Sequence, residues 1–326
     1  MNGWKMTGGS HVLSMGSLPA VIKDRIFIFF ELTKLHLTSF IALSAMFGQV
    51  IAAAFFSRDT LAAGGGVWLL AAGAAVLNNI QDRDYDRRFS RTRHRCLPQK
   101  KVPVHAAALL SLALICAGLA VLFGYPDTPL PGFLGLMALA CYNGLYTPLK
   151  KKTFLAVWPG VFCGMLPPAI GWTAVTAPGG KGSGQDLVIL MLVLGIWQVP
   201  HFLALRAGRW MLKAGGPCEL DHETSVFPCL ARWWTKTEIQ LQILIWVSLY
   251  SLAILLFLIR GGISSPEFSM ILAAMALVLP AGMAWLQKRG SGRPGGPGFA
   301  VVNLSLLVFM VLGIMDRTLT GIFPFL

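Results

Sequence analysis

Long apolar segments without charge run through this chain, and they restrict it to one class of fold. The segment from Leu61 to Ile80 contains no charged side chain, and about 20 apolar residues in a helix are enough to cross the hydrocarbon core of a bilayer. Hydrophobic residues make up 55% of the 326 residues and charged residues only 13%, a balance that soluble domains do not show. Because lipid offers the backbone no hydrogen bonds, such segments must be helical. The sequence therefore predicts an all-α polytopic membrane protein.

The apolar segments are numerous enough to predict about nine transmembrane helices. We expect these spans at 35–56, 61–81, 104–124, 130–148, 153–173, 186–206, 239–259, 267–286 and 298–315. The segments at 130–148 and 153–173 are short and contain proline and glycine, which interrupt regular helices.

The positive charges of the connecting loops predict the orientation of the chain. Of the 27 Lys and Arg residues, 23 fall on the N-terminal segment and the loops of the same side, and 4 fall on the other side. Cytoplasmic loops carry the excess of positive charge, so we expect a multi-pass protein of the inner (cell) membrane, with a cytoplasmic N-terminus and an external C-terminus. The division of the charge among short loops argues against a nucleic-acid partner.

Three aspartates follow the Leu61–Ile80 segment, where a helix would leave the membrane. Carboxylates at this position are costly unless they are neutralised, so their first interpretation is functional. In a helix, Asn78, Asp82 and Asp86 lie four residues apart and share one face. Two carboxylates and an amide oxygen suit Mg²⁺, which commonly shares its remaining positions with substrate phosphates. The alternative is a solvated helix end whose acids only pair with nearby arginines, an interpretation that fits Asp84.

Two basic clusters accompany the aspartates on the same predicted side of the membrane. The first runs from Arg87 to Arg95; within it Arg91 and Arg95 are one helical turn apart, and arginine binds phosphate through a bidentate fork. The second contains Lys150 and Lys151, which are able to hold a diphosphate as point charges. The clusters and the aspartates together predict a diphosphate site. Topological anchoring explains the lysines equally well, and it explains Arg91 and Arg95 less well.

Six motifs, in a fixed order, resemble those of a family of membrane enzymes. They are Leu32-Thr33-Lys34, Asn78-x-x-x-Asp82-x-x-x-Asp86, Arg91-Thr92-x-x-Arg95-x-Leu97-Pro98, Tyr146-Thr147 with Lys150-Lys151, Gly164 with Pro167-Pro168-x-x-Gly171-Trp172, and Trp197-x-x-Pro200-His201-Phe202 with Ala204-Leu205. This set resembles the UbiA superfamily of intramembrane prenyltransferases, and within it the haem O synthases. The resemblance covers residues 30 to 206 and is weaker afterwards.

The resemblance implies a fold, a reaction and a set of site residues. The spans would surround a central cavity, and the reaction would be the Mg²⁺-dependent transfer of farnesyl from farnesyl diphosphate to a vinyl group of haem B, giving haem O. Asn78, Asp82 and Asp86 would hold the metal ion and act in catalysis. The diphosphate would be bound by Arg91, Arg95, Lys150 and Lys151, and the haem acceptor by His201, Tyr146 and Trp197.

The resemblance also implies the organisation and the partners of the chain. Residues 1–30 would form a cytoplasmic tail and residues 31–326 the UbiA-type membrane domain. Besides the bilayer, farnesyl diphosphate and haem B, the expected partners are haem A synthase or assembly proteins of a terminal oxidase. For His201 a second interpretation stays open, in which its ring packs in the core or bonds a backbone carbonyl freed by Pro200.

The chain departs from the family pattern at three places. Leu35-His36 replaces Pro-Arg, Cys96 replaces Pro, and Trp210 stands near the position of a second acidic site. Glu219, Asp221 and Glu223 follow in the same loop and are candidates to replace that site. Two alternatives stay open, and the departures favour the first of them. One is a non-catalytic haem-handling or transport protein. The other is a prenyltransferase of an aromatic quinone precursor, which shares the first acidic motif but does not account for the Pro167-Pro168 and Pro200-His201 motifs.

Overall fold

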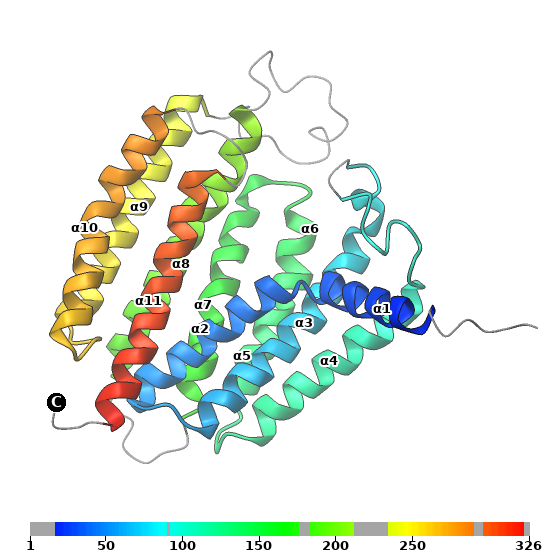
Figure 1. Cartoon of the computed structure of the whole chain (residues 1–326), viewed down its shortest axis with the longest axis horizontal. Coiled ribbons are helices and arrows are strands. Elements are labelled where there is room, and N and C mark those ends of the chain that lie inside the picture. Colours follow the sequence, from blue (N-terminus) through cyan, green and yellow to red (C-terminus); the bar gives the residue numbers. More distant parts are fainter. Residues whose placement is uncertain (1–16, 90–91, 176–182, 212–233, 290–295, 323–326) are drawn as a thin grey trace, which may run out of the picture.

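The computed structural model describes residues 17–89, 92–175, 183–211, 234–289 and 296–322, and the regular elements within these ranges are all helical (Figure 1). The elements are α1 (Ser17–Thr33), α2 (Leu35–Ala53), α3 (Arg58–Asp86), α4 (Val104–Gly124), α5 (Leu130–Leu139), the π-helix η1 (Ala140–Tyr146), α6 (Thr147–Leu149), the 3₁₀-helix η2 (Phe154–Ala156), α7 (Val157–Thr173), α8 (Gly184–Met211), α9 (Lys236–Ile259), α10 (Pro266–Lys288) and α11 (Pro297–Ile322). The predicted all-α architecture is confirmed.

Seven helices in the described part of the chain are long and apolar enough to cross a membrane. They are α2, α3, α4, α8, α9, α10 and α11, and each coincides with an expected span. The other two expected spans, 130–148 and 153–173, form α5 with η1 and α6, and η2 with α7, which has only 17 residues. The chain is a multi-pass membrane protein, and the count of nine spans stays a prediction.

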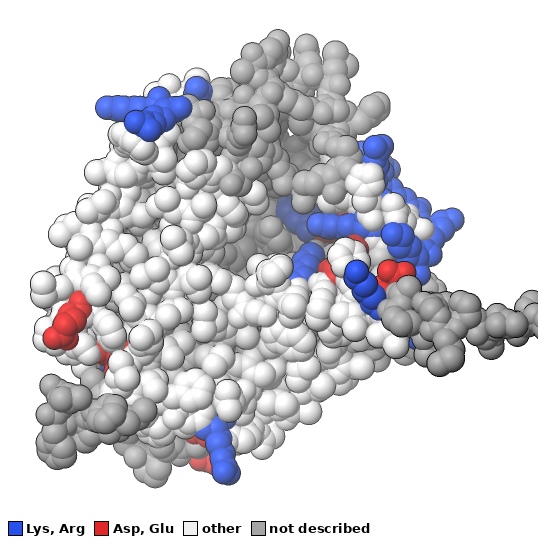
Figure 2. Space-filling model, in the orientation of Figure 1, with Lys and Arg blue, Asp and Glu red and all other residues white. Residues whose placement is uncertain are grey.

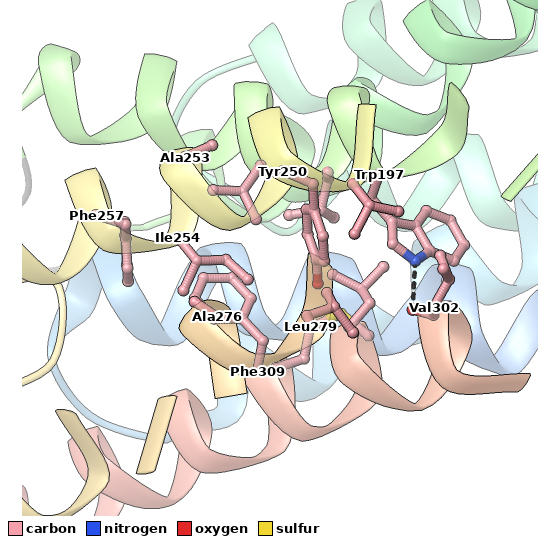
Figure 3. Packing of buried hydrophobic residues seen from close by; sticks show 14 of the residues in the cluster. Trp197, Tyr250, Ala253, Ile254, Phe257, Ala276, Leu279, Val302 and Phe309 are labelled. Carbon is pink, nitrogen blue, oxygen red and sulfur yellow. Dashed lines mark hydrogen bonds between the residues drawn. The ribbon is translucent and has the colours of Figure 1, made fainter. Parts of the chain in front are cut away.

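The helices form two groups, which meet where α7 packs against α8 and where α2 packs against α11 (Figure 1). In the first group, α2 packs against α3 and α7, and α3 packs against α4. In the second group, α8 packs against α9 and α9 against α10, while α11 contacts α2, α8 and α10. Figure 3 shows the core of the second group, where Tyr250, Phe257 and Phe309 are completely enclosed.

The outer surfaces of α4 and α10 are apolar. Leu109 and Leu112 of α4, and Leu277 and Val278 of α10, are each more than half exposed. Continuous apolar surface of this kind is unfavourable in water and is matched to hydrocarbon. The two helices therefore present the lipid-facing sides of the bundle.

Two glycines allow the backbones of α2 and α7 to touch. A Cβ atom on Gly48 of α2 would overlap the carbonyl oxygen of Pro168, and one on Gly171 of α7 would overlap the carbonyl oxygen of Ala45. Small residues are the usual means of close helix packing in membranes, where burial of apolar surface gives no driving force. The Pro167-Pro168-x-x-Gly171 motif therefore fixes the distance between these two helices.

Replacing Gly171 with alanine is expected to destabilise the fold. The new methyl group would push α7 away from α2, since the obstacle is backbone rather than a flexible side chain, at a cost of about 1–3 kcal/mol. Thermal unfolding in detergent measures the effect. Gly65→Ala is the matched control, because the space around that glycine on α3 is empty. Equal melting temperatures for the two variants would contradict the close contact.

Candidate active site

The last turns of α3 carry the predicted acidic stripe, and the stripe faces inward. Asn78, Asp82 and Asp86 are 2%, 8% and 7% exposed, which agrees with their four-residue spacing along one helix face. Asp84 lies on the opposite face, is exposed, and forms surface ion pairs with Arg83 and Arg87. The solvated-end interpretation therefore holds for Asp84 alone.

Cationic side chains surround the buried carboxylates. Asp82 contacts the ammonium groups of Lys150 at 2.5 Å and Lys151 at 2.9 Å, and Asp86 contacts Arg95 at 2.8 Å. Breaking a buried pair leaves an uncompensated charge, which is strongly unfavourable. The three predicted cations thus do more than anchor the topology, because each reaches a carboxylate of the stripe.

Lys34 is a fourth cation of the cluster among the described residues. Its ammonium group donates a 2.8 Å hydrogen bond to the amide oxygen of Asn78. Lys34 separates α1 from α2 and adopts the left-handed conformation, φ 52° and ψ 52°, which breaks the helix and turns its side chain toward α3. Burial, reinforced by the charges of Lys150 and Arg95, lowers the pKa of Lys34 to about 7.

Lys150 is also held in a partly dehydrated environment. Burial lowers the pKa of its ammonium group, and the neighbouring charge of Asp82 offsets part of that effect. The ring of Tyr146 lies 5.5 Å from the same ammonium group. Tyr146, a predicted acceptor-binding residue, therefore lies beside the acidic cluster.

The π-helix η1 and the residue after it orient the acidic stripe. The amide of Asn78 donates to the hydroxyl of Thr147 at 2.9 Å, and that hydroxyl donates to the carbonyl oxygen of Tyr142. One turn away, Gln81 donates to the carbonyl oxygen of Asn143, whose own amide returns a bond to Gln81. Single π-helical turns occur frequently at functional sites. Here the π-helix and Thr147 hold the side chains of Asn78 and Gln81, which lie next to Asp82 on α3.

The replacement of proline by Cys96 is accommodated in the loop after α3. The backbone N–H of Cys96 donates to a carboxylate oxygen of Glu31 on α1 at 2.8 Å, a bond that proline cannot make. Burial, with the charge of Glu31, raises the pKa of the Cys96 thiol to about 12, so the thiol stays protonated. This departure ties the loop to α1 and leaves the Arg95–Asp86 pair in place.

The oxygen atoms of the stripe match the chemistry of Mg²⁺. Asp82 and Asp86 offer carboxylates and Asn78 an amide oxygen, which are the hard ligands this ion prefers. An oxygen atom of each of the three side chains already contacts a cationic group. The site therefore favours positively charged groups. Within the described residues, no cluster of three His, Cys, Asp or Glu side chains forms a metal centre of the protein alone.

The remaining acceptor-binding candidates lie on α8. The indole of Trp197 is buried and donates to the carbonyl oxygen of Val302 on α11 at 2.8 Å (Figure 3). The ring of His201 lies 4.7 Å from that of Trp197 and 4.8 Å from that of Phe299. Phe40 of α2 also stacks on Trp197, with ring centres 5.9 Å apart.

Several predicted residues lie outside the described part of the chain. They are Arg91 of the basic run and the candidates for the second acidic site, Glu219, Asp221 and Glu223. Of the residues that are described, the structure brings Asn78, Asp82, Asp86, Arg95, Lys150 and Lys151 together. Figure 2 shows a recess bordered by Lys and Arg and by acidic residues at this end of the bundle.

The sequence interpretation missed two participants. The sequence marks Lys34 only as part of a motif at the start of a span, and Thr147 only as the neighbour of Tyr146. The signal for Lys34 was its position between two apolar helices, where a charged side chain needs a partner inside the protein.

Comparison with known proteins agrees with these observations. The model of the UbiA prenyltransferase family matches residues 38–304. A protoheme IX farnesyltransferase of Oleidesulfovibrio alaskensis is 33% identical over 300 residues, covering 89% of this chain and 96% of the relative. A protoheme IX farnesyltransferase of Geobacter sulfurreducens is 34% identical over 214 residues, covering 66% of this chain and 74% of the relative.

Solved structures share the fold at much lower identity. A structure of digeranylgeranylglyceryl phosphate synthase superposes with a TM-score of 0.67 at 16% identity, covering 90% of this chain and 99% of that one. A UbiA homologue of Archaeoglobus fulgidus bound to GPP and Mg²⁺ superposes with a TM-score of 0.62 at 13% identity, covering 89% of this chain and 99% of that one. At these identities the likeness concerns the fold alone.

Proposed function

The chain belongs to the UbiA prenyltransferase family, and we propose that it carries out the protoheme IX farnesyltransferase reaction. In this reaction the farnesyl group of farnesyl diphosphate is transferred to a vinyl group of haem B, giving haem O. The observation that carries the proposal is the buried cluster of Asn78, Asp82 and Asp86 in contact with Lys34, Lys150, Lys151 and Arg95. Relatives that align with most of the chain bear the same activity in their names.

The proposed role of the acidic stripe is to hold Mg²⁺. Bound by Asn78, Asp82 and Asp86, the ion would neutralise the diphosphate and favour its departure. The ion in the Archaeoglobus fulgidus homologue, which is bound to GPP and Mg²⁺, supports this choice of metal. The amide oxygen of Asn78 is oriented for the purpose, because the Asn78 amide nitrogen is engaged by Asp82 and Thr147.

The proposed role of the basic residues is to bind the diphosphate and stabilise it as it leaves. Lys150 and Lys151 contact Asp82 and are close enough to exchange a carboxylate oxygen for a phosphate oxygen. Arg95 is able to make the same exchange from Asp86. Preorganised cations aimed at a leaving group act at the point where charge develops.

The proposed chemistry then follows from the substrate. The bond between C1 of the farnesyl group and the diphosphate oxygen breaks, and the leaving diphosphate takes the electron pair. The terminal vinyl carbon of haem B attacks the allylic cation. Water adds to the adjacent carbon and loses a proton, which gives the hydroxyl group of haem O. Tyr146, beside Lys150, and Trp197 with His201 would bind the acceptor.

The proposed placement of the protein follows from its charge distribution. The acidic and basic motifs would open to the cytoplasm, where a charged diphosphate substrate is delivered, with the protein in the inner membrane. The apolar outer faces of α4 and α10 would contact lipid. A haem A synthase or an assembly protein of a terminal oxidase would receive the product.

A competition between acceptors tests the proposal. Farnesyl diphosphate, Mg²⁺ and equal amounts of haem B and an aromatic quinone precursor are added to membranes that contain the protein. The products are separated by chromatography and identified by mass spectrometry. We expect haem O and no prenylated quinone precursor. Prenylation of the aromatic acceptor would replace the proposal with the quinone alternative. If neither product formed, the result would favour a non-catalytic haem-handling protein.

A further inference from the structure

The hydrogen bonds of His201 determine which of its nitrogen atoms is free. Its Nδ1 lies 2.9 Å from the amide oxygen of Asn303 on α11. The amide nitrogen of Asn303 donates to the carbonyl oxygen of Phe299 at 2.6 Å, one turn earlier in the same helix. Because a carbonyl oxygen cannot accept from another oxygen, this second bond fixes the Asn303 amide with its oxygen toward His201. Nδ1 must therefore carry the proton.

The other nitrogen atom of His201, Nε2, then keeps its lone pair. Among the described residues, Nε2 has no hydrogen-bond partner, and the side chain is only partly buried. In metal-binding histidines, the second nitrogen usually donates to a carboxylate or carbonyl group, which fixes the tautomer and the orientation of the ring. His201 has this arrangement, with the Asn303 side chain as its partner.

The surroundings of His201 are flat and aromatic. Trp197 and Phe299 lie 4.7 Å and 4.8 Å from its ring, and Phe40 stacks on Trp197. Phe40 follows Lys34 by six residues on α2, which is about 9 Å along the helix axis. The aromatic group therefore lies at the same end of the bundle as the acidic cluster, and about two turns deeper.

We propose that Asn303 is a positioning residue that presents Nε2 of His201 as a ligand for the iron of a haem acceptor. The proposal deepens the farnesyltransferase function and rests on haem being the acceptor. Bound through its iron, the haem would be held beside Trp197 and Phe299, whose rings flank His201. The bond to Asn303 also raises the basicity of the imidazole as a ligand.

The test compares haem B with metal-free protoporphyrin IX. Both are titrated into the full-length protein in detergent, without farnesyl diphosphate, and affinity and absorption spectrum are recorded. Asn303→Leu removes the acceptor of the Nδ1 proton, so we expect haem binding to weaken about 10-fold with a shifted Soret band. Binding of protoporphyrin IX should not change, since it has no iron. Asn303→Asp keeps an oxygen acceptor for the Nδ1 proton but loses the bond to the Phe299 carbonyl oxygen. It should therefore retain more of the affinity and of the spectrum than Asn303→Leu, whereas His201→Ala should lose the ligated spectrum.

Two results would overturn the proposal. One is equal weakening of haem and protoporphyrin IX by Asn303→Leu, which is the result of a purely structural role. The other is an unchanged haem spectrum in His201→Ala. No prenyl donor is present, so these binding results do not depend on turnover. Iron ligation without haem O formation would reject only the transferase function. Haem O formation without iron ligation would reject only this inference.

Discussion

Asp82→Asn is expected to reduce prenyl transfer by about 10³-fold while the protein stays folded. The substitution removes one negative charge with little change in volume. Asp82 is the carboxylate that both Lys150 and Lys151 contact, and it is central to the proposed metal site. Without it, the diphosphate would be deprived of its metal ion at the step in which the C–O bond breaks.

The measurement for Asp82→Asn is the initial rate of haem O formation at saturating substrates. Asp84→Asn is a matched control, since Asp84 lies on the same helix but is exposed and pairs only with Arg83 and Arg87 among the described residues. We expect a near-normal rate for the control. A near-normal rate for Asp82→Asn would remove the metal role from the acidic stripe.

Lys150→Met is expected to lower kcat/KM for farnesyl diphosphate by about 10²-fold. Lys150 makes the shorter of the two lysine contacts with Asp82, at 2.5 Å, and its ammonium group lies beside Tyr146. Methionine retains the length and the apolar stem of lysine but cannot donate to a phosphate oxygen. The loss should therefore appear in both the binding of the diphosphate and its departure.

Lys152→Met separates this role from topological anchoring. Lys152 has the same charge in the same loop, but its side chain is exposed. If the lysines serve only to orient the protein in the membrane, the two variants should lose the same amount of activity and of correctly inserted protein. We expect normal insertion for both and a kinetic defect for Lys150→Met alone, measured at varied farnesyl diphosphate concentrations.

The sequence predicted those parts of the site that depend on local helical geometry. Asn78, Asp82 and Asp86 share a face because of the 3.6-residue period, and the structure buries that face. The seven helices that qualify as spans could be placed for the same reason, since length and hydropathy are local properties. The contacts of Arg95, Lys150 and Lys151 agree with the resemblance between their motifs and those of a known family.

The other parts depend on contacts between distant segments. Lys34 meets Asn78 across 44 residues and His201 meets Asn303 across 102, and no periodicity links such positions. The π-helix η1 was expected as part of an ordinary span, because a single inserted residue leaves no clear pattern in composition. The effect of Cys96 was also hidden, since its gain over proline is a backbone N–H that matters only because Glu31 lies opposite.

The most direct test of the central claim follows both products of the reaction in one sample. Purified protein receives haem B and farnesyl diphosphate with increasing Mg²⁺, and released diphosphate and haem O are measured together. The account predicts one haem O for each diphosphate released, with both abolished by a metal chelator and restored by added Mg²⁺. Haem O formation that persists in the chelator, or diphosphate release that leaves haem B unchanged, would contradict it.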